Sequence, residues 1–294
     1  HKVIDFSIAE LGDPPCKFTF MIMGSEGREE QTLVSDQDNG IVYQDPENDG
    51  EKRDALEYFT KFAELVCEQL NTAGYKFCDG DCMAKNPNWC QPLSNWKSHF
   101  HKWIYQGSPE DLLNSSIFFD FKGVWGDLDL TDQLKSYLMD CVEKRPVFLR
   151  FLAQNALLSK PPLGMFGKLI VESKGEHKGA VNVKGAMLPV VDLARIYALI
   201  YRIVHTNTLT RLFRLYTKRV LNNKQYIDMV QSYNYVMHLR FLRQITTIID
   251  EEKPPDNYVN PKNFSYLDNA MLKEVFKKIE QIQQKLKSEF LGTT

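Results

Sequence analysis

Two aspartates separated by one residue, Asp36 and Asp38, are the residues of this sequence best suited to hold a metal ion. They stand directly before an apolar run, "NGIVY" (39–43). Side chains alternate along an extended chain, so both carboxylates point to the same face. Neighbouring carboxylates repel each other unless a cation lies between them, and their oxygens are ligands that Mg²⁺ prefers. The spacing therefore predicts a metal site with room for water and phosphate oxygens.

A glycine-serine pair and an arginine upstream of the aspartates are suited to binding phosphate. Gly24-Ser25 follows a second apolar run, "KFTFMIM" (17–23), where a strand would pass into a helix. Glycine lets a phosphate approach the backbone, and the N–H groups at the start of a helix attract anions. The Ser25 hydroxyl adds a donor, and Arg28 is a candidate partner for a phosphate. The alternative is a solvated acidic loop, which is disfavoured because charge beside a buried strand is costly.

The elements that must position these residues form a mixed α and β half of the chain. Apolar spacing predicts helices where every third or fourth residue is apolar, and strands where β-branched and aromatic residues form short runs. The expected helices are 3–11, 52–72 and 95–105, the expected strands are 17–23, 39–43 and 115–126, and 75–93 is expected to be irregular.

From residue 130 onward the pattern is helical. A boundary near Arg145-Pro146 divides the helical stretch 130–158, because proline restricts the residue before it. A Gly/Pro-rich connector, 160–189, has room for a small hairpin. The expected helices beyond it are 190–205, 208–221, 224–250 and a tail helix that contains Leu272 and Phe290.

Composition excludes several classes of protein. The 294 residues are 43% hydrophobic and 25% charged, as in ordinary globular proteins. A net charge of −2 gives no bulk attraction for nucleic acid. No apolar run approaches the roughly 18 residues that a membrane span requires. Because the chain starts at His1, we expect it to be part of a longer protein.

The six cysteines are typical of reduced thiols, which favours a cytoplasmic location. Cys78 and Cys82, with Cys90 nearby, suggest a zinc site as an alternative to ordinary thiols. No second close pair accompanies them, so ordinary thiols are the favoured interpretation.

The stretch "GSEGREEQTLVSDQDNGIVY" (24–43) resembles the Gly-Ser and Asp-x-Asp signature of the DNA polymerase beta-like nucleotidyltransferases. More narrowly, it is similar to the nucleotidyltransferases found in bacterial signal-transduction proteins behind CBS or cyclic-nucleotide-binding domains. These are themselves similar to the catalytic domain of the PII-protein uridylyltransferase. The resemblance continues through "FFDFKGVWGD" (118–127), "PPLGMFGKL" (161–169) and "LPVVDLARIYAL" (188–199), of which the last two resemble that family's helical substrate-binding domain.

The resemblance implies an α+β fold. A small mixed sheet flanked by helices would form a nucleotidyltransferase domain over residues 1–140, and an all-α helical bundle would form a substrate-binding domain over residues 141–294. It further implies a regulatory domain upstream of His1 in the full-length protein, and it is compatible with a homodimer.

The implied activity is transfer of UMP or AMP from a nucleoside triphosphate to a protein or small-molecule acceptor in signal transduction, with release of pyrophosphate. Its cofactor would be two Mg²⁺ ions, with Mn²⁺ as an alternative, held by Asp36, Asp38 and a third carboxylate on a neighbouring strand. The candidate for the third is Asp120, within the apolar run "IFFDF" (117–121).

The resemblance assigns Gly24, Ser25 and Arg28 to the triphosphate, and Lys184 in the connector is a further candidate for a phosphate. Two departures from the family pattern affect the cleft rather than the metal ligands. Lys122 stands where an arginine is expected, and Asn182 stands where the family often has aspartate.

Two further Asp-x-Asp pairs, at 79–81 and 127–129, are interpreted as loop and turn residues. Arg211, Arg214 and Lys218 follow helical spacing, so they predict either a positively charged wall for the substrate or a solvated helix face. Two other functions remain as alternatives to the enzyme. One is a nucleotide-sensing regulatory module without turnover, and the other is a helical docking domain carried by an inert α/β half.

Overall fold

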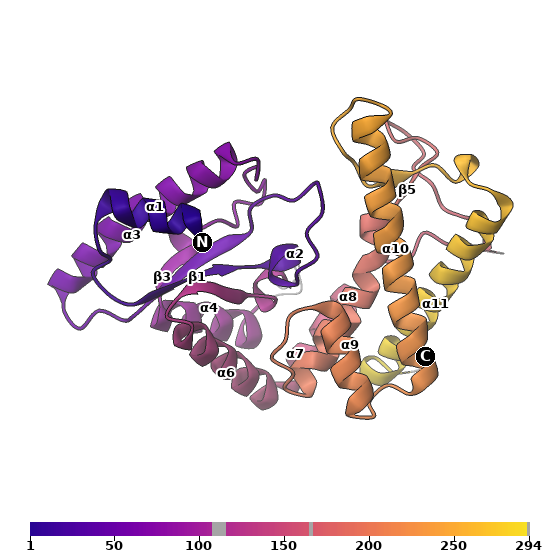
Figure 1. The fold of residues 1–294 in the computed structure, drawn as a ribbon. Coiled ribbons are helices and arrows are strands. Elements are labelled where there is room, and N and C mark those ends of the chain that lie inside the picture. The colour runs from indigo at the N-terminus through magenta and orange to yellow at the C-terminus, as the bar shows by residue number, and fades with distance from the viewer. Residues whose placement is uncertain (108–115, 165–166, 293–294) are drawn as a thin grey trace. The chain divides into compact units, whose positions relative to one another are not determined.

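The computed structural model describes residues 1–107, 116–164 and 167–292 (Figure 1). The chain divides into two compact units. One comprises His1–Gln31 and Ser35–Arg145, and the other comprises Thr32–Val34 and Pro146–Thr294. The first is mixed α and β and the second is mainly helical, which confirms the α+β fold class.

The N-terminal unit is built on a small mixed sheet. Its strands are β1 (Phe18–Ile22), β2 (Asn39–Tyr43), β3 (Cys90–Pro92) and β4 (Lys122–Gly126), in the order β3-β2-β1-β4. β1 runs antiparallel to both β2 and β4, and β3 runs parallel to β2. The predictions of β1 and β2 are confirmed. β3 was missed, because a strand of three residues between turns has no recognisable period.

Helices lie on both faces of this sheet. Figure 1 shows α1 and α3 over one face and α4 and α6 over the other. Asn48 begins α3 by accepting a hydrogen bond from the Glu51 N–H, so the helix starts a few residues before the expected position. The helices are α1 (Lys2–Leu11), α2 (Gly24–Gly27), α3 (Asp49–Thr72), α4 (Leu93–Tyr105) and α6 (Asp129–Lys144), with short 3₁₀ helices at Pro87–Trp89 and Ser116–Phe119.

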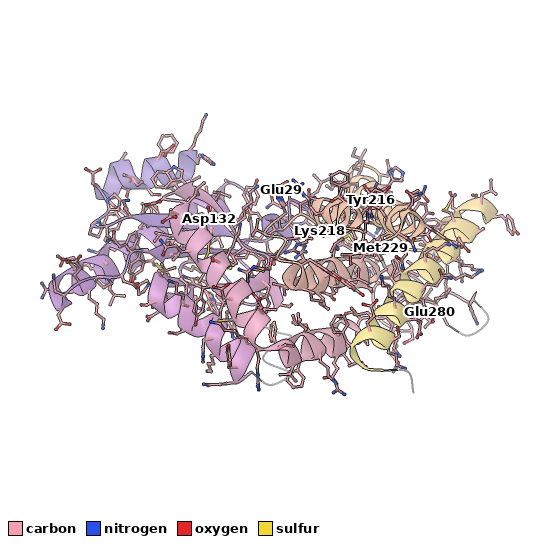
Figure 2. All side chains as sticks on the ribbon, turned by 90° about the horizontal axis from the view of Figure 1, so that it is seen from below. Glu29, Asp132, Tyr216, Lys218, Met229 and Glu280 are labelled. Carbon is pink, nitrogen blue, oxygen red and sulfur yellow. The ribbon has the colours of Figure 1, made fainter. Side chains whose placement is uncertain are left out.

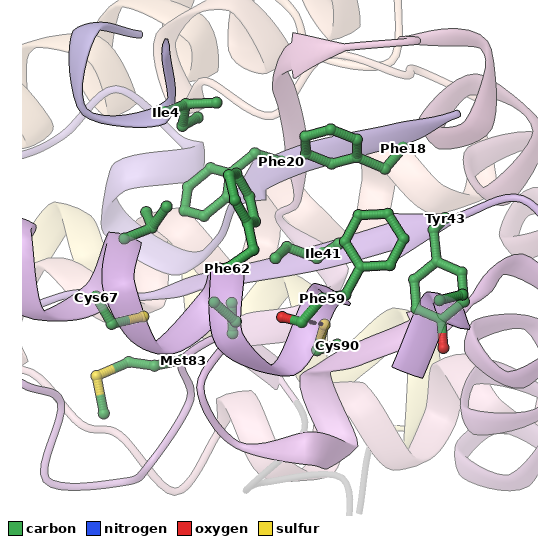
Figure 3. Packing of buried hydrophobic residues seen from close by; sticks show 14 residues of the cluster. Ile4, Phe18, Phe20, Ile41, Tyr43, Phe59, Phe62, Cys67, Met83 and Cys90 are labelled. Atoms are coloured by element: carbon green, nitrogen blue, oxygen red, sulfur yellow. Dashed lines mark hydrogen bonds between the residues drawn. The ribbon is translucent and has the colours of Figure 1, made fainter. Parts of the chain in front are cut away.

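The core between the sheet and α3 is aromatic (Figure 3). Alternate residues of β1, Phe18 and Phe20, face it, as the two-residue period of a strand requires. Phe59 of α3 stacks on Tyr43 of β2 with ring centroids 4.6 Å apart, and it lies 5.2 Å from Phe18. This packing fixes the sheet whose far end carries the candidate site.

The strand expected over 115–126 is wrong in its first part, and Ser115 lies outside the described residues. Ser116–Phe119 is a 3₁₀ helix, and β4 begins at Lys122. Asp120 lies between the two, where its N–H donates to the Ile117 carbonyl at 3.3 Å. The aromatic run is buried, as expected, but burial alone does not distinguish a strand from a tight helical turn.

The second unit is built around the helix α8 (Val183–Ile200), which is buried along most of its length. The expected helix over 190–205 is wrong at both ends. Asn182 caps α8 by accepting from the Gly185 N–H at 3.0 Å, and Pro189 is accommodated inside the helix. The other elements are α7 (Pro146–Ala156), α9 (Thr208–Thr217), α10 (Asn223–Ile249), α11 (Tyr266–Phe290), a 3₁₀ helix at Pro261–Asn263, and a two-stranded sheet of β5 (Val181–Asn182) and β6 (Tyr258–Val259).

The connector before α8 contains an isolated antiparallel bridge between Leu163 and Leu169. Met165 and Phe166, in the motif at 161–169, lie outside the described residues. Within the described ranges, no helix is long and apolar enough to cross a membrane.

We expect Phe59→Ala to lower the free energy of unfolding by about 3–5 kcal/mol, because it leaves a cavity in the aromatic core. Phe59 is 1% exposed, whereas Phe6 on α1 is 65% exposed and provides a control of the same residue type. Phe6→Ala should change stability by less than about 0.5 kcal/mol. Urea denaturation followed by tryptophan fluorescence measures both variants, and equal losses would contradict the assigned core.

Candidate metal and phosphate site

The register of the sheet brings the candidate residues to one of its ends. Ile22 of β1 pairs with Asn39 of β2 and with Lys122 of β4. Segments that follow β1 therefore meet segments that precede β2 and β4. The Met23 N–H donates to the Asp38 carbonyl at 2.8 Å, directly beyond the last pair of β1 and β2. The turn that contains Gly24 and Ser25 (the phosphate turn), the Asp-x-Asp pair and Asp120 consequently lie at one end of the sheet.

Asp36, Asp38 and Cys78 form a group that could hold a metal ion, since one ligand atom of each lies within 4.8 Å of the others. Asp38 is buried, and the other two are half-buried. Asp36 sits in an isolated parallel bridge with Lys76, just before β2 rather than inside it. The structure thus brings together the two predicted aspartates, and it adds a thiol that the sequence suggested as a ligand only alongside other cysteines.

Backbone and side-chain bonds fix the segment that carries Cys78. The Gln37 N–H donates to the Lys76 carbonyl at 2.9 Å, and the Asn39 N–H donates to the Cys82 carbonyl at 3.0 Å. The Asn39 side-chain oxygen accepts from the Ala84 N–H at 2.9 Å. The chain on either side of Cys78 is therefore held against the residues on either side of Asp38. This pairing is long-range, so residue spacing could not have revealed it.

The donor set fits a divalent cation with oxygen ligands, because the two carboxylates supply hard oxygens and negative charge. The thiol has different chemistry. A hydrogen bond with the Cys82 side chain lowers the pKa of Cys78 to about 6, although burial opposes the shift. The same pairing, together with burial, raises the pKa of Cys82. Cys78 therefore adds a soft donor beside the carboxylates.

Gly24 allows the phosphate turn to approach Asp38. It is buried with φ at +57°, and an added Cβ would lie 3.0 Å from Asp38 Oδ2 and 2.6 Å from Ile117 Cγ1. A side chain is therefore excluded by both conformation and space. The helix expected after Gly24-Ser25 is a single turn, α2, in which Ser25 is half-buried.

Arg28 is buried and paired with two carboxylates. Its Nη1 lies 2.8 Å from Asp120 Oδ2, and its Nε lies 2.8 Å from Glu30 Oε2. Asp120 is 0% exposed and is not part of the group formed by Asp36, Asp38 and Cys78. The roles predicted for Asp120 as a metal ligand and for Arg28 toward phosphate remain predictions. Glu30, the second partner of Arg28, was not anticipated.

The remaining candidates have separate surroundings. Lys184 belongs to the helical unit, where it is exposed in the first turn of α8, so its phosphate role stays a prediction. Lys122 forms an ion pair with Glu29 just beyond α2. Asp127 lies at the opposite end of β1, where its N–H donates to the Phe18 carbonyl and its carboxylate pairs with Lys17 at 3.1 Å. The turn interpretation of the 127–129 pair agrees with this position.

The positive residues of α9 do not form one uniform face. Arg211 is buried and donates from Nε to the His205 carbonyl at 2.7 Å, so it stabilises the start of the helix. Arg214 is exposed, and so is Lys218 at the C-terminal end of the helix (Figure 2). Exposure of these two residues fits both a solvated face and a positively charged wall, so both interpretations remain for them.

Two family models match the chain. Residues 1–110 match the model described as "Putative nucleotidyltransferase DUF294", and residues 146–290 match the model described as "Putative nucleotidyltransferase substrate binding domain". Asp36, Asp38 and Cys78 lie in the first match, and Asp120 lies outside both. A comparison with curated proteins gave no match.

We expect Glu26→Gln to stabilise the protein at pH 8 by on the order of 2 kcal/mol. Burial raises the pKa of Glu26 to about 7. A raised carboxyl pKa means that the unfolded chain loses this proton first, so stability falls as pH rises from about 4.5 to about 7. The gain in melting temperature should therefore be larger at pH 8 than at pH 5. A gain independent of pH would refute the assignment.

Arg28→Met should lower the free energy of unfolding by about 3–5 kcal/mol, because it leaves Asp120 and Glu30 buried without their cation. Arg53 on α3 is the matched control, since its side chain is 78% exposed and lies 3.7 Å from an exposed Asp54 carboxylate. Arg53→Met should cost less than about 0.5 kcal/mol. Thermal unfolding at pH 7.5 compares the two, and a small loss for Arg28→Met would contradict a structural role for the pair.

Proposed function

We propose, because the chain belongs to the nucleotidyltransferase family that both models describe, that it transfers UMP or AMP from a nucleoside triphosphate to a protein or small-molecule acceptor. The observation that carries this proposal is the group of Asp36 and Asp38 beside the Gly24 turn. A carboxylate pair that meets a glycine turn at one sheet end is suited to a metal-bound triphosphate.

The proposed reaction is an in-line displacement at the α-phosphorus. A bond forms between the acceptor oxygen and the α-phosphorus, and the bond from that phosphorus to its bridging oxygen breaks. Pyrophosphate leaves with the electron pair, and the acceptor hydroxyl gives its proton to a base or to water. Mg²⁺ held by Asp36 and Asp38 would supply the positive charge that neutralises the phosphates.

The chain's own residues position the substrate. Because Gly24 has no side chain, the phosphates could approach Asp38 closely. The Ser25 hydroxyl would donate a hydrogen bond to a phosphate oxygen. The phosphate-binding role of Lys184 remains part of this proposal. Positioning and charge neutralisation supply most of the rate in phosphoryl transfer, so these roles need no acid or base of unusual pKa.

Asp120 enters the proposal with a condition. Oδ2 of its carboxylate is paired with Arg28, so a metal or a proton would have to share the carboxylate with that cation. The ion pair holds Asp120 just before β4, close to the turn that contains Gly27. An added Cβ on Gly27 would lie 2.0 Å from the Asp120 carbonyl oxygen, which shows how closely the two segments approach.

We further propose that the helical unit binds the acceptor, since residues 146–290 match a substrate-binding model. The signalling role, the cytoplasmic location, the upstream regulatory domain and a homodimer belong to the same proposal. They rest on the family resemblance.

A module that binds nucleotide without turnover is the second candidate. The pairing of Asp120 with Arg28 favours it, because a carboxylate already engaged by a buried arginine is less available to a metal. The two candidates predict the same binding of nucleotide and differ in pyrophosphate release.

We expect the Asp36→Asn/Asp38→Asn variant to lose transfer by at least about a hundredfold, because it removes the charge that holds the metal. The assay incubates the protein with Mg²⁺, α-phosphate-labelled UTP or ATP and a lysate of the source cell. It measures labelled product and pyrophosphate. The matched control is Asp127→Asn/Asp129→Asn, which makes the same change in an Asp-x-Asp pair at the other end of the sheet.

Labelled product that disappears in the first variant and persists in the second supports catalysis. Saturable binding of nucleotide by the wild-type protein without release of pyrophosphate would instead establish the sensing module.

A further inference from the structure

Cys78 gives the metal group a donor that Mg²⁺ does not use. Its sulfur and one oxygen each of Asp36 and Asp38 lie within 4.8 Å of one another. Mg²⁺ takes oxygen ligands in a near-ideal octahedron, whereas thiolate ligands suit Zn²⁺ and other soft cations. The group is therefore a mixed site with two hard ligands and one soft ligand.

The ligand atoms lie within 4.8 Å of one another, at most about 1.5 Å farther apart than around a tetrahedral zinc ion. Zinc lies about 2.3 Å from sulfur and about 2.0–2.2 Å from oxygen, so its ligand atoms are roughly 3.3–3.8 Å apart. Asp36 and Cys78 are both half-buried, and movement of their side chains would have to close the remaining distance. Three protein ligands leave one position open, as in zinc sites that bind water or substrate.

The thiol is held in place before any ion arrives. The Cys78 N–H donates to the Met83 sulfur at 3.3 Å, and the Cys82 thiol donates to the Gly80 carbonyl at 3.5 Å. The Cys82 carbonyl accepts from the Asn39 N–H, so the turn that carries both cysteines is fixed to the start of β2. A ligand whose segment is already fixed loses less conformational freedom when the ion binds, which favours binding.

We propose that Asp36, Asp38 and Cys78 form a mixed carboxylate–thiolate site that binds a thiophilic divalent cation of the Zn²⁺ class. Binding forms a metal–sulfur bond and releases the thiol proton to solvent. Binding of this cation requires only these three side chains and does not rest on the proposed function. Its competition with Mg²⁺ rests on the proposed function, because that function places Mg²⁺ on the same two carboxylates. Zinc bound there excludes Mg²⁺ and makes nucleotidyl transfer sensitive to free zinc.

Co²⁺ is the probe for this site, because a cobalt–thiolate bond gives a charge-transfer absorption in the near ultraviolet. The experiment titrates Co²⁺ into the reduced full chain without nucleotide. We expect the band in the wild-type protein, its loss in Cys78→Ser, and its retention in Cys16→Ser. Cys16 is a matched control, since it is a half-buried thiol of the same unit that bonds to the Gln44 carbonyl.

A second measurement tests the carboxylates. Zn²⁺ affinity, determined by competition with a chromophoric chelator, should fall at least about tenfold in Cys78→Ser and in Asp36→Asn/Asp38→Asn. Far-ultraviolet circular dichroism and melting temperature check that each variant is folded. No band in the wild-type protein, or a band that Cys82→Ser abolishes and Cys78→Ser preserves, would overturn the proposal. Unchanged zinc affinity in the carboxylate variant would overturn it as well.

The outcome is distinguishable from that of the proposed function. The cobalt band is measured without nucleotide or acceptor, so it can be present when no transfer occurs. In that case the thiophilic site stands and nucleotidyl transfer fails. Nucleotidyl transfer by a protein that lacks the band would support the proposed function and contradict the thiophilic site.

Discussion

The antiparallel pairing of β1 with β2 on one side and β4 on the other determines where each candidate residue of the N-terminal unit lies. Because Ile22 is the last residue of β1 and faces both Asn39 and Lys122, the turn after β1 meets the residues before β2 and β4. A shift of one residue would turn Phe18 and Phe20 away from the core against α3. The aromatic core therefore fixes the register, and the register assembles the site.

This assembly brings several acidic groups together at a buried end of the sheet. Burial of these charges lowers the stability of the fold unless positive charge compensates them. Arg28 offsets part of the cost because it lies between Asp120 and Glu30 with both contacts at 2.8 Å. The pair at Asp36 and Asp38 is arranged differently. The side chain grouped with it is that of Cys78, which has no positive charge. This end of the sheet thus contains a part that Arg28 neutralises and a part whose ligand atoms could hold a cation.

Local sequence patterns predicted the elements in which apolar residues recur regularly. They failed to predict positions that depend on contacts between segments far apart in the sequence. β1, β2 and α3 follow from apolar runs and spacing, and Asp36 and Asp38 follow from their place beside β2. Two features of the site depend instead on contacts between distant segments, and one depends on a local turn. The Lys76 bridge brings in Cys78, the 3₁₀ turn places Asp120 before β4 rather than within it, and the pairing of Arg28 engages a guanidinium that the motif assigned to phosphate.

A comparison of two Asp-x-Asp pairs shows why spacing alone does not define a metal site. Asp127 and Asp129 stand at the other end of β1, at the start of α6, where Lys17 and the helix N-terminus compensate their charge. Asp36 and Asp38 have the same spacing, but Asp38 is buried against Gly24 and both lie beside a thiol. The fold already compensates the charge of the first pair, whereas the second is the pair to which we assign a cation. In that proposal the side chains around the carboxylates, and Cys78 above all, decide which cation binds.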